Sequence, residues 1–296
     1  MSKLNDQAQV YKLTLRTQSK RAEISAVLKM LLNSCDIREE QIVEEIDRRS
    51  RTLTVYLPDQ HRGQVIKGKL SRLGLKHVAL KGENLSAAQW QNLWKKNIHP
   101  FYLSRRFSVI PQWAKRSRLK QRRTPISIDT TFAFGTGLHE TTRFMAHLIE
   151  RCRGRFFSFL DIGTGTGILS IVARHCEARI VDGVDLKQDV IQTAQANMKR
   201  NGFEFSRLEH RGLEHFSRRR AYDLVVANLV TDQLLRLKER IFRCVKKDGH
   251  LAVSGISLEN LPHFRQEFCN KDFRCVSIVR GKMWAALLYR RRKPGV

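Results

Sequence analysis

Three glycines at alternate positions, Gly163, Gly165 and Gly167, are the feature of the sequence best suited to binding a ligand. They follow an apolar run and precede a stretch with helical periodicity, so they form a turn from a strand into a helix. Glycine lets a ligand approach the backbone closely in such a turn. A dinucleotide loop would carry glycine where this chain has Ile168. The spacing therefore favours a ligand that joins a nucleoside to an amino acid, without a pyrophosphate.

Two polar residues end neighbouring predicted strands. Asp185 lies 22 residues after Gly163, and its carboxylate can accept hydrogen bonds from both hydroxyls of a ribose. The alternative for Asp185 is a cap of the following helix. Asn228 ends the buried strand Tyr222–Asn228, and ligands of open α/β sheets bind beyond the carboxyl ends of the strands. We expect both side chains to face one crevice, although an ordinary turn asparagine is the alternative for Asn228.

The second half of the chain has the rhythm of a parallel sheet with helices on both faces, because short apolar runs alternate with helical stretches. The predicted strands are Phe156–Leu160, Arg179–Val184, Asp223–Ala227 and His250–Ser254, with two late strands, Phe273–Val279 and Met283–Tyr289. The predicted helices are Ile168–His175, Asp189–Asn201 and Asp232–Val245, the last followed by a turn at Lys246–Gly249.

Residues 1–85 have the pattern of a small α+β domain. Strands are predicted at Val10–Arg16, Gln41–Asp47, Thr52–Leu57 and Lys76–Leu80, and helices at Arg21–Leu32 and His61–Leu73. That order, β-α-β-β-α-β, is the ferredoxin-like plan. Residues 86–126 are expected to form a helix capped by Ser86, carrying Trp90 and Trp94 on one face, and then a basic linker. Residues 127–296 would form the ligand-binding α/β domain.

The stretch Phe134–Thr142, which reads Phe-Gly-Thr-Gly-Leu-His-Glu-Thr-Thr, is similar to the signature of the ribosomal-protein methyltransferase A (PrmA) family. Residues Trp90–Pro100 and Pro111–Trp113 also resemble that family's linker. The resemblance implies a Rossmann-like domain dependent on S-adenosylmethionine (SAM), preceded by a substrate-recognition domain at 1–85. It also implies methylation of lysine or N-terminal amines of the eleventh large-subunit ribosomal protein.

The resemblance implies four cofactor contacts, which are Thr142, Gly163, Asp185 and Asn228. Asn228 would also serve the reaction by orienting the acceptor amine. No metal is implied. His139 is the nearest candidate base in the sequence, and a structural histidine is the alternative. The chain departs from the family pattern at several positions. Glu140 stands where proline is common, and Asp129–Ala133 replaces the usual Asp-Pro-Gly.

The net charge of +27 favours a polyanionic partner. Residues 101–126 hold eight basic and no acidic side chains, almost a third of the excess. We predict that this segment contacts ribosomal RNA or another polyanion, and a solvated basic linker is the alternative. Its basic residues are Arg105, Arg106, Lys115, Arg116, Arg118, Lys120, Arg122 and Arg123. The acidic cluster Glu39, Glu40, Glu44, Glu45 and Asp47 could face a basic protein, or could form a solvated surface.

Several function classes are disfavoured by the sequence. No apolar run approaches the roughly 20 residues of a membrane helix, and the first residues are polar, so a cytoplasmic monomer is expected. The six cysteines lack the spacing of metal ligands. An RNA methyltransferase is the second hypothesis, but Asn228–Thr231 lacks the prolines and the aromatic of a base-stacking motif. A lysine methyltransferase of another protein and an inactive binding module are further alternatives.

Overall fold

The computed structural model describes residues 9–18, 28, 31–32, 35, 37, 42–46, 50–57, 60–75, 77–86, 89, 99–114, 122–129, 139–216 and 221–292. The chain divides into two compact units, Met1–Asn97 and Ile98–Val296. Among the described residues, no helix is long and apolar enough to cross a membrane.

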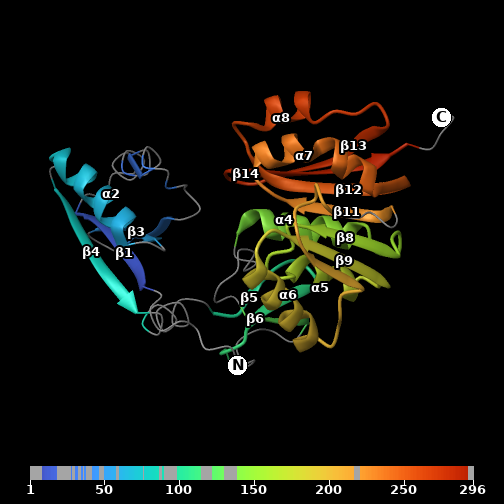
Figure 1. Cartoon of the computed structure of the whole chain (residues 1–296), viewed down its shortest axis with the longest axis horizontal. Helices are drawn as coiled ribbons and strands as arrows, with labels where there is room; N and C mark the ends of the chain where they lie inside the picture. Colours follow the sequence, from blue (N-terminus) through green and yellow to red (C-terminus); the bar gives the residue numbers. More distant parts are fainter. Residues whose placement is uncertain are drawn as a thin grey trace. The chain divides into compact units, whose positions relative to one another are not determined.

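The first unit is built on a four-stranded antiparallel sheet with the order β2-β3-β1-β4 (Figure 1). Its elements are β1 (Gln9–Thr17), β2 (Ile42–Ile46), β3 (Arg51–Leu57), α2 (Gln60–Arg72) and β4 (Val78–Ser86). Alternate residues of the central strands, such as Leu13, Leu15, Leu53 and Val55, are buried with Ile66 of α2. The alternation places one face of the sheet against the helix. Most of the predicted helix Arg21–Leu32 lies outside the described residues.

Strand β4 is longer than predicted and ends at Ser86. Ser86 and Gln89 exchange hydrogen bonds, because the Gln89 N–H donates to the Ser86 hydroxyl at 3.2 Å and the Ser86 N–H donates to Gln89 Oε1 at 2.9 Å. This reciprocal pattern is that of a helix N-cap. Trp90 and Trp94 lie outside the described residues.

Residues 101–128 contain strands, whereas the sequence suggested a basic linker. Strands β5 (Phe101–Tyr102), β6 (Phe107–Pro111) and β7 (Thr124–Ile128) form a small sheet with the order β5-β6-β7. The reason is packing, since Phe107, Val109 and Ile126 are completely buried in the main core of the second unit. The basic side chains that surround these short apolar runs obscured them in the sequence.

The second unit is a mixed seven-stranded sheet with the order β10-β9-β8-β11-β12-β14-β13 (Figure 1). Its elements are α4 (Glu140–Arg151), β8 (Ser158–Ile162), α5 (Ile168–His175), β9 (Ile180–Asp185), α6 (Gln188–Arg200), β10 (Arg207–His210), β11 (Tyr222–Asn228), α7 (Thr231–Cys244), β12 (Val245–Ser257), α8 (Leu261–Glu267), β13 (Phe273–Arg280) and β14 (Trp284–Arg291). Strands β10, β9, β8, β11 and β12 run parallel to one another. Strand β14 is antiparallel to both of its neighbours, β12 and β13.

Helices cover both faces of this sheet, as the sequence pattern predicted. Leu224 and Val226 of β11 belong to the core under α4, α5 and α6, whereas Val225 and Ala227 belong to the core under α7 and α8. The fold is therefore α/β with a mixed sheet. One prediction was wrong in detail, because the expected turn at Lys246–Gly249 lies within the long strand β12.

Candidate functional site

The carboxyl ends of β9, β8 and β11 lie side by side and bring three predicted site residues to one edge of the sheet. Ile162 of β8 pairs with Val184 of β9 and with Ala227 of β11. The residue that follows each of these three is Gly163, Asp185 or Asn228. The three site residues are therefore neighbours in space, because parallel strands end at the same edge of the sheet. Gly163 and Asn228 are nevertheless 65 residues apart in the chain.

The glycine loop turns its threonines inward and leaves its first two glycines partly open. Gly163, Gly165 and Gly167 have φ values of 72°, 55° and 78°, in the left-handed region that glycine adopts without strain. Thr164 and Thr166 are buried, whereas Gly163 and Gly165 are partly exposed. The accessible surface of the loop is thus glycine backbone, with the Leu229 side chain close to Gly163.

A buried carboxyl group supports the loop from the inside. Asp161 Oδ2 accepts hydrogen bonds from the hydroxyls of Thr164 at 3.1 Å and Ser170 at 2.7 Å. Burial raises the pKa of Asp161 to about 6, although these two hydrogen bonds act in the opposite direction. Sequence reasoning did not single out Asp161, and its position two residues before Gly163 was the available signal.

Asp185 combines a structural role with an accessible position. Its Oδ2 accepts a hydrogen bond from the Gly165 N–H at 3.0 Å, and its Oδ1 accepts one from the Lys187 N–H at 3.2 Å. The second bond supports the helix entry that was the alternative interpretation. Each carboxylate oxygen can accept further hydrogen bonds, and the residue is only half-buried. The adjacent Leu186 is 64 % exposed, which leaves an open apolar side chain beside the carboxylate.

The start of α4 lies at the same edge of the sheet. The Glu140 carboxylate accepts hydrogen bonds from the N–H groups of Lys282 (3.1 Å), Met283 (3.4 Å) and Trp284 (3.3 Å). Trp284 pairs with Ser257 of β12, three residues beyond Ser254, which pairs with Asn228. The glutamate that departs from the family pattern therefore fastens α4 to the β13–β14 turn.

Thr142 and His139 take different positions within this region. Thr142 is 2 % exposed, inside the first turn of α4. His139 is the N-cap of that helix, with Nδ1 2.7 Å from the Thr141 hydroxyl oxygen. Its ring also packs edge-on against Trp284, with 5.4 Å between ring centroids. These contacts give His139 the structural role that was the alternative to a base. Sequence reasoning did not identify Trp284, whose contact depends on residues 145 positions apart.

Comparison with known proteins assigns the family. The family model described as ribosomal protein L11 methyltransferase (PrmA) matches residues 5–292. A ribosomal protein L11 methyltransferase of Acetivibrio thermocellus is 33 % identical over 201 residues, which cover 68 % of this chain and 64 % of the relative. One from Dictyoglomus turgidum is 32 % identical over 220 residues, which cover 74 % of this chain and 72 % of the relative.

The crystal structure of a ribosomal protein L11 methylase from Lactobacillus delbrueckii subsp. bulgaricus aligns with a TM-score of 0.60 at 30 % identity. The alignment covers 66 % of this chain and all of that chain. The chain belongs to the ribosomal protein L11 methyltransferase family. This membership confirms the resemblance carried by the Phe134–Thr142 signature, and with it the class of enzyme, a SAM-dependent protein methyltransferase.

The signature itself lies mostly outside the described residues of this methyltransferase, since the structure resumes at His139. The same holds for Lys115, Arg116, Arg118 and Lys120 of the basic segment, and for Glu39, Glu40 and Asp47 of the acidic cluster. Glu44 and Glu45 belong to β2, where only the backbone is described.

The described arginines of the basic segment flank the small β5-β6-β7 sheet of the methyltransferase. The Arg123 guanidinium lies 3.7 Å from the centroid of the Tyr102 ring, and its Nε donates a hydrogen bond to the Arg105 carbonyl at 3.0 Å. Arg123 is thus held by the fold. No group of three or more histidine, cysteine or acidic side chains among the described residues could hold a metal ion.

Proposed function

We propose that this methyltransferase binds SAM at the carboxyl ends of β8, β9 and β11 and transfers its methyl group to amines of ribosomal protein L11. The observation that carries this proposal is the Asp185 carboxylate beside an open glycine backbone. A nucleoside needs acceptors for its ribose hydroxyls, and the remaining lone pairs of Asp185 supply them. Leu186 offers an apolar surface next to that carboxylate. The exposed donors and acceptors therefore fit the nucleoside part of SAM.

When bound, SAM supplies an electrophilic methyl group. The residues of the chain have to hold the acceptor amine in line with that group, and orientation of this kind can lower a barrier by about 7–11 kcal/mol. We assign the orienting role to Asn228, whose side-chain carbonyl oxygen can accept a hydrogen bond from the amine. Lysine has a pKa of about 10.4 in water, and its removal from water beside a cation favours the neutral form. No separate catalytic base is assigned, and Thr142 is proposed as a fourth cofactor contact.

The sheet of the first unit has the order expected for a ferredoxin-like domain, which supports that assignment for residues 1–85. We propose that this domain recognises the protein substrate and that the second unit, Ile98–Val296, holds the transfer site. We propose that the enzyme acts in the cytoplasm, because the proposed substrate is a ribosomal protein, and that it acts as a monomer.

The acceptor class is tested by incubating the enzyme with methyl-labelled SAM and, in separate reactions, ribosomal protein L11, an unrelated basic protein of equal size, or ribosomal RNA. We expect label on ribosomal protein L11 alone, and none with the Asp185→Ala or Asn228→Ala enzyme. Label on RNA would overturn the proposed acceptor. Wild-type activity of both variants would overturn the proposed site.

Contact with ribosomal RNA is a second proposal, and the concentration of arginines around the β5-β6-β7 sheet favours it. The enzyme should bind ribosomal RNA with an affinity that falls steeply as salt rises, because neutralised phosphates release counterions. Replacing Arg105, Arg106 and Arg122 by glutamine should reduce the salt slope by about 2 to 3. Arg123 is kept because it packs on Tyr102. Salt-independent binding would contradict this proposal.

A further inference from the structure

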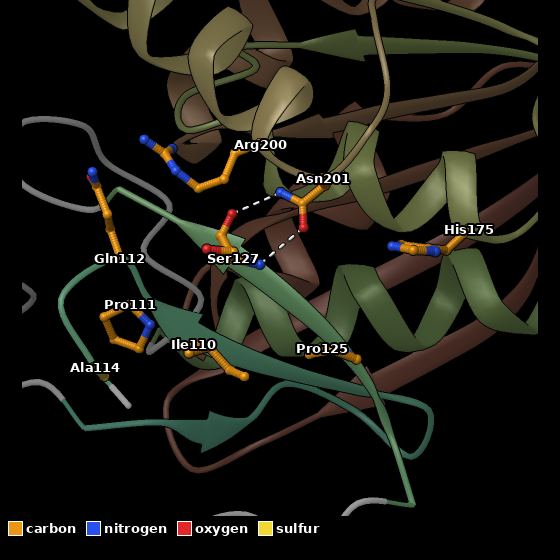
Figure 2. A pocket seen from close by; sticks show the side chains of 9 residues that line it. All are labelled: Ile110, Pro111, Gln112, Ala114, Pro125, Ser127, His175, Arg200 and Asn201. Atoms are coloured by element: carbon orange, nitrogen blue, oxygen red, sulfur yellow. Dashed lines mark hydrogen bonds between the residues drawn. The ribbon is translucent and has the colours of Figure 1, made fainter. Parts of the chain in front are cut away.

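The side chains of Asn197 in α6 and of Asn201, the C-cap of that helix, pair with the free edge of β7 as an additional strand would. The Ser127 N–H donates to Asn201 Oδ1 at 2.9 Å, and Asn201 Nδ2 donates to the Ser127 carbonyl at 2.7 Å (Figure 2). Two residues further along, the Asp129 N–H donates to Asn197 Oδ1 at 2.8 Å, and Asn197 Nδ2 donates to the Asp129 carbonyl at 3.2 Å. Each amide thus pairs with a residue of the chain as a peptide group would.

The geometry of helix and strand explains why this pairing fits. Two residues of a strand span about 6.6 Å, and the four residues from Asn197 to Asn201 rise about 6 Å along a helix. The other edge of β7 is occupied by β6, since the Thr124 N–H donates to the Arg106 carbonyl and the Ile128 carbonyl accepts from Gln112. The amides therefore satisfy the polar groups that face away from β6.

The two amides differ in their remaining contacts, and only Asn197 bonds to the glycine loop. Asn197 Nδ2 also donates to the carbonyl of Thr166, in the glycine loop, at 2.9 Å. Its Oδ1 accepts a second hydrogen bond from Arg200 at 2.7 Å, so all four hydrogen-bonding positions of this completely buried side chain are used. Asn201 does not bond to the glycine loop among the described residues; instead its Nδ2 donates a second hydrogen bond to the Asn197 carbonyl at 2.8 Å.

The glycine loop lies directly against this part of α6. A Cβ atom on Gly167 would lie 3.3 Å from the backbone of Ala194, one turn before Asn197. The loop therefore rests on the helix at Gly167 and is bonded to it at Thr166. A cavity of about 390 Å³ lies next to the Asn201 pair, and its lining includes Ser127, Arg200 and Asn201 (Figure 2). None of these residues belongs to the glycine loop.

We propose that Asn197 is a positioning residue for the cofactor: it fixes the Thr166 carbonyl relative to β7 and so holds the backbone of Gly163 and Gly165 in the conformation that binds SAM. This inference rests on the proposed placement of SAM at the glycine loop. Asn201, one helical turn away, anchors β7 in the same way without touching the loop. It therefore provides a matched control within the same helix.

The test measures SAM affinity by calorimetry and thermal stability for Asn197→Ala, Asn197→Asp and Asn201→Ala. We expect both alanine variants to melt at lower temperature, because each loses the β7 pairing. Only the two Asn197 variants should bind SAM at least tenfold more weakly. Their KM for SAM should rise by a similar factor, with kcat at saturating SAM within about twofold of wild type. Asn197→Asp keeps the shape and the acceptor but lacks both N–H groups, which donate to the carbonyls of Thr166 and Asp129. Wild-type affinity in that variant would overturn the proposal.

A measurement on the wild-type enzyme covers the case in which the Asn197 variants do not fold. Side-chain amide protons of asparagine can be followed by NMR as S-adenosylhomocysteine is added. Exchange of the Asn197 amide protons should slow by at least fivefold, while exchange of the Asn201 amide protons stays unchanged. Equal behaviour of the two amides would overturn the inference.

The two proposals fail in distinguishable ways. Wild-type SAM affinity in Asp185→Ala would reject the proposed binding of SAM at the glycine loop. The proposed role of Asn197 would then be rejected as well. Loss of affinity in Asp185→Ala together with wild-type affinity in Asn197→Ala would leave the cofactor site standing and reject only the role of Asn197.

Discussion

The amino ends and the carboxyl ends of the strands in the seven-stranded sheet each carry a hydrogen-bonded aspartate, Asp223 and Asp185, and the two aspartates differ in their contacts. At the amino edge, Asp223 Oδ2 accepts hydrogen bonds from the N–H groups of Phe157 (3.0 Å) and Ser158 (2.8 Å) and from the Ser158 hydroxyl (2.8 Å). Its Oδ1 accepts one from Lys246 at 2.8 Å. At the carboxyl ends of the strands, the Asp185 carboxylate accepts two hydrogen bonds from the described residues, from the N–H groups of Gly165 and Lys187.

The difference separates a carboxylate that ties strands together from one that can receive a ligand. Asp223 connects the starts of β8, β11 and β12, and its bonding capacity is taken up by the chain itself. Although burial raises its pKa, the hydrogen bonds from Lys246, Ser158 and Phe157 hold the pKa of Asp223 below its ordinary value. Asp185 keeps lone pairs next to glycine backbone. Unused hydrogen-bonding capacity beside an open backbone therefore marks the site.

The largest expected effect comes from Asp185→Ala. Two hydrogen bonds from ribose hydroxyls to a charged group contribute about 3 to 6 kcal/mol, so SAM affinity should fall by at least about 100-fold. Stability should change by less than about 1 kcal/mol, because the side chain is half-exposed. Calorimetry and thermal melting measure the two quantities on one sample. A large loss of stability with unchanged SAM affinity would show that Asp185, like Asp223, serves only to hold strands together.

Asp223→Ala is expected to produce the reverse result. Removal of the carboxylate leaves two strand N–H groups and Lys246 without their acceptor, which should lower stability by about 2 to 3 kcal/mol. SAM affinity of the folded variant should stay within about twofold of wild type. Because the native pKa of Asp223 is depressed, its contribution is present above the unfolded pKa and is lost as pH falls through the native value. The stability difference should therefore shrink below about pH 4; chemical denaturation from pH 3 to pH 7 checks this.

The smallest effect concerns Asp161, which supports the loop from within. Its native pKa of about 6 is raised, so the folded protein holds the extra proton between about pH 4 and pH 6. The stabilising contribution is full below pH 4 and is lost as pH rises through 6. Asp161→Asn cannot ionise, so its stability relative to wild type should rise by on the order of 2 kcal/mol from pH 4 to pH 7. A parallel pH dependence of the two proteins would show that Asp161 titrates normally.

Much of the second unit was predictable because its local signals agree with its tertiary structure. Buried apolar runs end in Gly163, Asp185 and Asn228, and the topology of parallel strands alone brings these ends together. The family signature named the class of enzyme. The described residues of the first unit also form the strands predicted at Val10–Arg16 and Thr52–Leu57.

The missed features depend on partners that are distant in the chain. Asn197 and Asn201 resemble the solvated face of a helix until β7 is placed beside them, 68 and 74 residues away. Glu140 looked like a simple departure from the family, and only the fold shows that it binds three N–H groups of the turn before β14. Strand pairing of Val109 with Ile126 was hidden instead by the basic side chains around these short apolar runs.

The most direct test of the cofactor site follows backbone amide signals by NMR as S-adenosylhomocysteine is added. We predict that the amides of Gly163, Gly165 and Lys187 at the carboxyl edge shift as the ligand binds. The amides of Phe157 and Ser158, which bond to Asp223 at the amino edge, should keep their positions. Shifts at Phe157 and Ser158 with unchanged signals from the glycine loop would contradict the central claim.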